Sequence, residues 1–187
     1  MSTLISILRG INVSGSKIIK MAELQKLFEQ LGFENVTTYI QSGNVVFQGR
    51  EKDTPEKISD TIEKAIRKKF GFDVPVITIP AGEMKRVVAE NPLVKKKGID
   101  ETKLHVTFLS TLPAKDKVDF LLSQDFSPEE FFLKGKAIYL SCPNGYGNAK
   151  LNNNFLESKL KVKATTRNWK TVNVLAELSA TLNSRKK

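Results

Sequence analysis

The 187-residue chain contains one cysteine, one histidine and one tryptophan. With Cys142 alone, an internal disulfide is excluded, which suits a reducing compartment. With His105 alone, a metal site made of several histidines is excluded, and a histidine-based triad would depend on that one residue. No pair of acidic residues stands in a recognisable hydrolase motif. We therefore expect no metal, no cofactor and no catalytic residue. We favour a binding protein over an enzyme, and an enzyme stays the open alternative.

The sequence also lacks long hydrophobic runs, although 40% of its residues are hydrophobic, enough for a packed core. No run approaches the roughly 18 apolar residues that a membrane-spanning helix needs. The opening segment MSTLISILRGINV has no basic lead and no small-residue cleavage site, so it predicts a strand rather than a signal peptide. We expect a cytoplasmic protein with no membrane partner.

Positive charge is in excess and unevenly placed. The net charge is +10, and residues 150–187 carry nine Lys or Arg against two acids, so +7 lies there. Such a field attracts phosphorylated metabolites or nucleic acid. A solvated surface with a basic tail at residues 185–187 is the alternative interpretation.

Hydrophobic periodicity in the first part of the chain predicts one structural unit. Short apolar runs predict strands, and apolar residues at helical spacing predict two helices; Thr54 or Asp53 caps the second helix, with Pro55 in its first turn. The order is βαββαβ, typical of a ferredoxin-like unit. The expected elements are strand 4–8, helix 21–31, strand 36–40, turn 41–44, strand 45–47, helix 55–70 and strand 74–79.

The same order recurs later, without residue-level identity to the first part. The expected elements are linking helix 81–90, strand 104–109, a helix at 118–122, strands 130–133 and 137–141, helix 151–160, strand 162–165 and helix 169–182. We predict an α+β fold of two ferredoxin-like (βαββαβ) halves with an appended C-terminal helix. The halves are residues 1–80 and 104–187, the second including the last helix, and a helical linker joins them at 81–103.

The stretch from Ser141 to Trp169 contains two helix starts near basic residues. A helix N-terminus presents unpaired N–H groups and the positive end of a dipole, which favours anions. One start follows Gly145-Tyr146-Gly147 and Lys150, a loop that matches neither the Walker nor the Rossmann glycine spacing. The other follows Arg167 and Asn168, which would open the last helix. The alternative interpretation of this segment is structural, with Trp169 as a core anchor.

Two loops of the first half have similar composition. Arg9 and Asn12 follow the first strand, where an ion-paired Arg and a loop-closing Asn are the plain alternative. Ser42 and Asn44 lie at a hairpin tip, where a simple turn is the alternative. We predict that four loops meet at one basic site. Its anion-binding residues would be Arg9, Asn12, Ser42, Asn44, Tyr146, Lys150, Arg167 and Asn168.

Four segments resemble one bacterial family, the domain of unknown function numbered 1697 (DUF1697). They are LRGINVSG from Leu8, TYIQSGNVVF from Thr38, PNGYGNAKL from Pro143 and ATTRNWKTV from Ala164. The resemblance implies a two-part fold of ferredoxin-like character and brings no established activity. Ser14 and Asn148 depart from the family pattern, where Gly and Ser are common, and Asn148 alters hydrogen bonding in its loop.

Three functions follow from these observations. The first is a binding module for a small phosphate-bearing anion. The second is an enzyme that acts on a phosphoester or nucleotide by electrostatic stabilisation, with Tyr146 as a proton donor. The third is a protein-interaction module that uses uncovered sheet faces, and the oligomeric state stays open. The aromatic platform of RNA-recognition domains is missing, so any nucleic-acid binding should be weak and non-specific.

Overall fold

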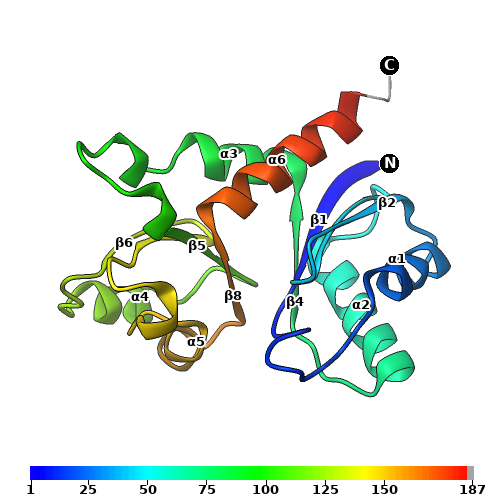
Figure 1. Cartoon of the computed structure of the whole chain (residues 1–187), viewed down its shortest axis with the longest axis horizontal. Helices are drawn as coiled ribbons and strands as arrows, with labels where there is room; N and C mark the ends of the chain where they lie inside the picture. Colours follow the sequence, from blue (N-terminus) through cyan, green and yellow to red (C-terminus); the bar gives the residue numbers. More distant parts are fainter. Residues whose placement is uncertain (185–187) are drawn as a thin grey trace. The chain divides into compact units, whose positions relative to one another are not determined.

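A computed structural model describes residues 1–184 (Figure 1). The chain divides into two compact units. Unit 1 consists of residues 1–86 and the chain from residue 174 onward, and unit 2 consists of residues 87–173. The basic tail at residues 185–187 lies outside the described residues.

Unit 1 contains the first predicted ferredoxin-like half. Its sheet has the strand order β2-β3-β1-β4, and every neighbouring pair is antiparallel. This arrangement is the split βαβ topology that the element order predicted. The elements are β1 (Ser2–Leu8), α1 (Met21–Gln30), β2 (Glu34–Tyr39), β3 (Asn44–Gly49), α2 (Pro55–Phe70) and β4 (Val76–Pro80).

Local signals define the helix ends in unit 1. Thr54 caps α2 by accepting a hydrogen bond from Lys57 N, and Pro55 opens the helix. Gly71 closes α2 in the left-handed region at φ 75°. These capping predictions are confirmed.

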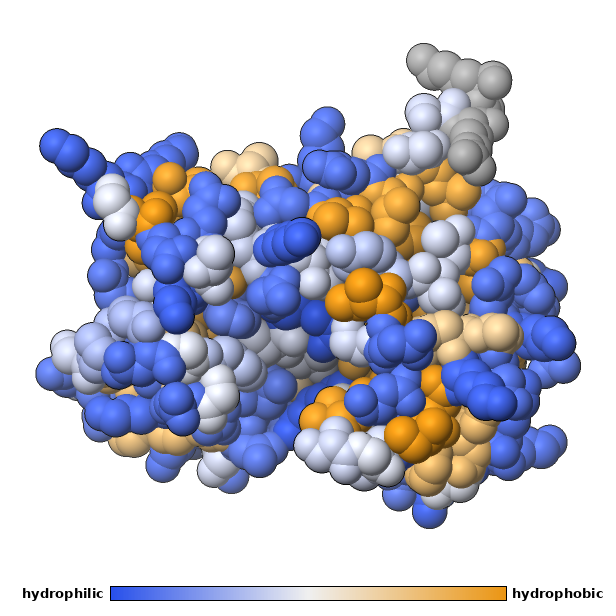
Figure 2. All heavy atoms as spheres, viewed as in Figure 1, coloured by the Kyte–Doolittle hydropathy of each residue, from blue (hydrophilic) through white to orange (hydrophobic). Residues whose placement is uncertain are grey.

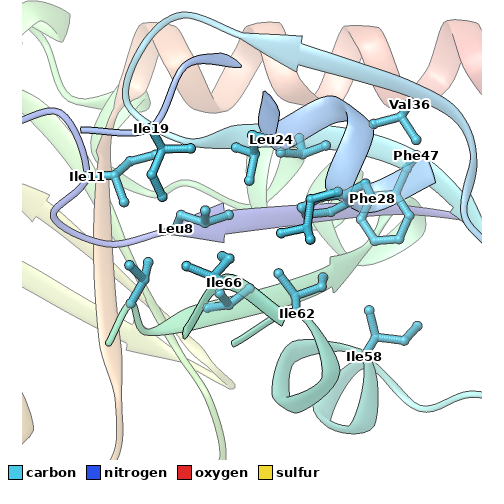
Figure 3. Packing of buried hydrophobic residues seen from close by; sticks show 14 of the residues in the cluster. Leu8, Ile11, Ile19, Leu24, Phe28, Val36, Phe47, Ile58, Ile62 and Ile66 are labelled. Carbon is cyan, nitrogen blue, oxygen red and sulfur yellow. The ribbon is translucent and has the colours of Figure 1, made fainter. Parts of the chain in front are cut away.

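The core of unit 1 lies between its sheet and the two helices, α1 and α2, which cover one face (Figure 1). Leu8 of β1, Phe28 of α1 and Ile62 of α2 meet there and are fully buried (Figure 3). The rings of Phe28 and Phe47 lie edge to face, with centroids 5.2 Å apart. Burial of such apolar surface is the main stabilising term.

The opposite face of this sheet is also apolar, since Ile5 and Ile7 alternate with Leu4 and Leu8 and are fully buried. Val46 of β3 lies on this face opposite Ile5. A cavity of about 170 Å³ beside it is lined by Thr37, Val46, Leu178, Thr181 and Leu182. The end of the last helix therefore packs with unit 1. The prediction from the sequence, which places the whole helix in the second half, is corrected here.

Unit 2 contains the second ferredoxin-like half. Its antiparallel sheet has the order β6-β7-β5-β8. The chain enters through α3 (Ala81–Ala89) and two short 3₁₀ helices, Leu93–Lys95 and Glu101–Lys103, so the predicted linker is largely helical. The remaining elements of the chain are β5 (Leu104–Leu109), α4 (Lys115–Leu122), β6 (Glu130–Lys134), β7 (Ala137–Ser141), α5 (Asn153–Leu160), β8 (Ala164–Asn168) and α6 (Trp169–Ser184). The part of α6 from residue 174 onward belongs to unit 1.

The last strand is longer than predicted. The sequence placed its end at residue 165 and put Arg167 at the start of a helix, but Arg167 lies in β8 opposite Val106, and Asn168 lies opposite His105. Pairing with β5 continues the strand until Trp169, where α6 begins. Local propensity does not reveal this pairing, because it depends on a strand about sixty residues earlier in the chain.

The core of unit 2 lies between its sheet and α4 and α5. Phe126 packs edge to face against Phe131 and Phe155, with centroids 5.8 and 5.5 Å away. Tyr139 of β7 is buried, and its hydroxyl donates a hydrogen bond to Val87 O at 3.0 Å. Trp169 is 6% exposed, so its predicted role as a core anchor is confirmed.

The visible surface is mostly hydrophilic, with hydrophobic side chains among the charged ones (Figure 2). Within the described chain, no helix is both long enough and apolar enough to cross a membrane.

Candidate functional site

Asn12 closes the loop that follows β1. Its Nδ2 donates to Ile19 O at 2.9 Å and to Gln41 O at 2.8 Å, and its Oδ1 accepts from Ile19 N at 2.8 Å. Both amide hydrogens are therefore committed to backbone carbonyls. Asn12 ties this loop to the turn between β2 and β3, which is the loop-closing role that we gave as the plain alternative.

The β2–β3 turn is held from within by Asn44. Its Nδ2 donates to Tyr39 O at 3.1 Å and to Ser42 Oγ at 2.9 Å. The turn also bonds to β1, because Leu8 N donates to Gly43 O at 2.8 Å. Ser42 and Asn44 thus support the turn, and it lies against the end of β1.

Strained backbone marks these two loops. Ile40 has φ 49°, and Asn12, Ser14 and Lys17 also have positive φ. A β-branched residue in the left-handed region is a genuine outlier that surrounding contacts must hold in place. Arg9 directly follows β1; its backbone N–H donates to Pro75 O at 2.9 Å, and the residue is half-buried.

In unit 2, the backbone amides behind the Gly-Tyr-Gly loop already bind an anionic group of the protein. Glu129 Oε1 accepts from Lys150 N at 2.7 Å, and Glu129 Oε2 accepts from Leu151 N at 3.0 Å. The first turn of α5 is capped by Asn152, whose Oδ1 accepts from Phe155 N at 3.0 Å. The carboxylate of Glu129 therefore occupies two backbone amides next to the loop where the sequence predicts an anion site.

The hydroxyl of Tyr146 belongs to a connected polar network. It donates to Thr166 Oγ1 at 2.9 Å, and Thr166 Oγ1 donates to Asn153 Oδ1 at 2.7 Å. The Thr107 hydroxyl lies 2.7 Å from the same Thr166 oxygen. The ring of Tyr146 stacks on His105 with centroids 5.0 Å apart. The loop is thereby attached to β5, β8 and α5.

Arg167 brings a positive charge to this network. Its Nη1 donates to Thr166 O at 2.9 Å, so the guanidinium turns back along the end of β8. Desolvation lowers the pKa of Arg167 to about 10, and the neighbouring Tyr146 opposes that shift. The side chain stays protonated at neutral pH, but its surroundings disfavour the charge.

Asn168 is the N-cap of the last helix, as predicted. Its Oδ1 accepts from Thr171 N at 2.8 Å. The role that the structure supports for Asn168 is therefore capping of α6. Lys150 directs its side chain to a cavity between α4 and α5, and Tyr146, Arg167 and Asn168 do not line that cavity.

Cys142 and His105, the residues considered for nucleophilic or base chemistry, both have pKa values shifted in favour of the uncharged form. Burial raises the pKa of the Cys142 thiol to about 11, and Glu129 adds to the rise. Burial lowers the pKa of His105, partly offset by its contact with Lys103 O. Cys142 is thus a thiol rather than a thiolate at neutral pH. Among residues 1–184, no group of three or more His, Cys, Asp or Glu could hold a metal ion.

Four residues of these clusters were not selected from the sequence: Thr107, Glu129, Asn153 and Thr166. Thr166 directly precedes Arg167, and that adjacency was the one available signal. The other three reach the site through strand pairing and loop packing, which leave no local pattern. The predicted residues form two groups, one in each unit: Arg9, Asn12, Ser42 and Asn44 in unit 1, and Tyr146, Arg167 and Asn168 in unit 2 with Lys150 nearby in the chain.

Sheet order and helix placement define an α+β protein with two ferredoxin-like units and a C-terminal helix. The chain belongs to the family described as Protein of unknown function (DUF1697), whose model matches residues 1–139. The family predicted from the four segments is therefore confirmed.

The structure resembles a solved one titled as that of the conserved bacterial protein SP0830 from Streptococcus pneumoniae. The similarity has a TM-score of 0.76 at 20% sequence identity, and covers 95% of this chain and 98% of that one. At this identity the likeness concerns the fold. No curated protein matches the chain.

Proposed function

We propose that the protein binds a small phosphate-bearing anion at the end of β8, where Tyr146, Thr166 and Arg167 meet. The observation that carries this proposal is the position of Arg167. Its Nη1 is held by Thr166 O, the residue is half-buried, and desolvation lowers the pKa of its guanidinium. A desolvated cation is stabilised by an anion that contacts it, so phosphate binding would offset the desolvation cost.

The neighbouring groups match the chemistry of a phosphate. An Arg presents a planar fork of donors, and the hydroxyl of Tyr146 would donate to a phosphate oxygen in exchange for its bond to Thr166. The network through Thr107 and Asn153 holds both hydroxyls in place before a ligand arrives. The charge of +7 on residues 150–187 attracts anions to this part of the chain.

Arg9 and the strained loops of unit 1 extend the proposal. They form a second group with hydrogen-bonding capacity, within unit 1. Asn12 is the exception, because both of its amide hydrogens are bound to backbone carbonyls. We therefore propose that Arg9 and Ser42, rather than Asn12, would contact an anion that binds at the loops of unit 1.

Thermal-shift measurements with pyrophosphate, ribose 5-phosphate and adenosine 5′-monophosphate test the proposal, since a ligand of the native state raises stability by mass action. We expect at least one compound to raise the melting temperature of the wild type, and to do so much less in Arg167→Gln. Lys170→Gln is the matched control, an exposed cation in the first turn of α6. Equal shifts in Arg167→Gln and wild type would contradict the proposal. Turnover of a compound, abolished by Arg167→Gln, would instead support the enzyme alternative.

A further inference from the structure

A cavity of about 460 Å³ opens between α4 and α5 of unit 2. Its volume falls within the range of about 300–1,000 Å³ that small-molecule sites occupy. The residues that line it come from the end of α4, the loop after it, the loop before α5 and α5 itself. They are Phe120, Gln124, Asp125, Phe126, Lys150, Asn152, Phe155 and Lys159.

Three phenylalanines supply aromatic walls. Phe126 is 7% exposed and packs edge to face with Phe155, so these two rings are fixed by the core. Phe120 is 45% exposed and projects from α4. An exposed ring beside two anchored rings leaves apolar surface that a flat ligand ring can cover.

Lys159 is held at this aromatic surface. Its Nζ lies 5.4 Å from the ring centroid of Phe120 and 5.8 Å from that of Phe155. Both distances fall within the range of a cation–π interaction, about 6 Å. The ammonium is therefore positioned before any ligand binds, which lowers the ordering entropy that binding costs. The ammonium of Lys159 beside these rings disfavours a cationic ligand.

The other polar side chains of the cavity are engaged locally. Asp125 Oδ1 accepts from Ser127 N at 2.8 Å and from Ser127 Oγ at 2.6 Å. Asn152 caps α5 and donates to Ala149 O at 3.0 Å. Lys150 and Lys159 form no ion pair with a carboxylate within residues 1–184, and only Asp125 opposes their charge in the lining. The lining is net positive.

We propose that this cavity binds a small aromatic carboxylate, independently of the phosphate site at β8. The ligand ring packs against Phe120, Phe126 and Phe155, and its carboxylate pairs with Lys159 and Lys150. Charge complementarity selects an anion, and the rings select an aromatic body over a sugar phosphate.

The test is an NMR titration of the ¹⁵N-labelled protein with 2-naphthoate, and in parallel with the uncharged 2-naphthalenemethanol. We expect naphthoate to shift the amides of α4, α5 and the loop between Ser123 and Ser127, with weaker binding of the alcohol by about tenfold or more, the value of one hydrogen bond to a charged group. Lys159→Ala should lose that discrimination, while Lys115→Ala should keep it, because Lys115 is an exposed α4 lysine outside the lining.

Asp125→Asn distinguishes an electrostatic role of the cavity lining from a structural one, because only an electrostatic role predicts tighter binding of the anion. The Asn oxygen can still accept from Ser127, but the opposing charge is gone, so naphthoate should bind more tightly while the alcohol is unaffected. Arg167→Gln should leave naphthoate binding unchanged, which separates this site from the phosphate site. Equal affinity for acid and alcohol, equal loss in Lys115→Ala and Lys159→Ala, or absence of shifts around the cavity would each overturn the proposal.

Discussion

The hydroxyl of Tyr146 donates a hydrogen bond of 2.9 Å to Thr166 Oγ1, joining the loop after β7 to the middle of β8. The ring of the same Tyr146 stacks on His105 of β5. One side chain thus attaches a glycine-containing loop to two strands. Tyr146 also raises the pKa of Arg167, against the larger lowering by desolvation.

Tyr146→Phe removes this hydroxyl and keeps the ring stack. We expect the free energy of unfolding to fall by about 1 kcal/mol, the usual net value of one hydrogen bond. Urea denaturation measures the change. Tyr39→Phe is the control, because the Tyr39 hydroxyl has no hydrogen bond within residues 1–184, and it should be near neutral. Similar losses in the two variants would show that the Tyr146 bond adds no stability.

Gly43→Ala tests the close approach of the β2–β3 turn to β1. Gly43 has φ 76°, and an added Cβ would lie 2.8 Å from Leu8 Cβ and 2.8 Å from Ile11 Cδ1. Leu8 Cβ cannot move without the strand, so we expect a loss of about 3 kcal/mol from backbone strain and overpacking together.

Gly10→Ala is the matched control for Gly43→Ala. Gly10 has φ 71°, but an added Cβ meets nothing within 4 Å. Only the left-handed conformation is penalised, at about 1 kcal/mol. Chemical denaturation of both variants separates the two terms. Equal losses would mean that the turn relaxes away from Leu8 at little cost.

Cys142 should make stability depend on alkaline pH. Burial raises the pKa of its thiol from 9.0 to about 11, with a smaller contribution from Glu129. Between those values the unfolded chain loses the proton and the native chain keeps it, so the stabilising contribution is full below pH 9 and is lost as pH rises through about 11. Urea denaturation across this range should give a steeper fall for wild type than for Cys142→Ala.

The same thiol should be unreactive in the native protein. At about pH 8, Ellman's reagent should modify Cys142 slowly in buffer and rapidly in denaturing urea, since the thiolate is the reacting form and the side chain is buried. Rapid native modification would show that the thiol is exposed or activated, and would reopen a nucleophilic role.

Nucleic-acid binding should be weak and governed by salt. Neutralising phosphates with lysine and arginine releases counterions, so affinity for a single-stranded oligonucleotide should fall steeply from about 50 to about 200 mM salt. Deleting residues 185–187, outside the described part of the chain, should weaken binding to all sequences alike, and Tyr146→Ala should change it little. Discrimination of more than about tenfold between an oligonucleotide and its scrambled version would contradict this prediction.

The order of elements was readable from the sequence because it depends on local patterns. Short apolar runs located the strands, and Thr54, Pro55 and Gly71 bounded α2 where the structure has them. The doubled βαββαβ order then leaves few sheet topologies, and the split βαβ is the one observed. Asn168 as the cap of α6 and Trp169 as a core residue follow from the same kind of local reasoning.

The chemistry of the candidate site depended on tertiary structure. The sequence placed Arg167 at a helix start, but pairing with Val106 put it in β8, and desolvation of its charge follows from that position. Likewise, glycine content indicated an anion-binding loop, but the carboxylate of Glu129 lies on the amides of Lys150 and Leu151. Both outcomes join residues far apart in the chain. Local patterns determine which elements form, whereas pairing and packing decide which polar groups meet and which are already satisfied by the protein itself.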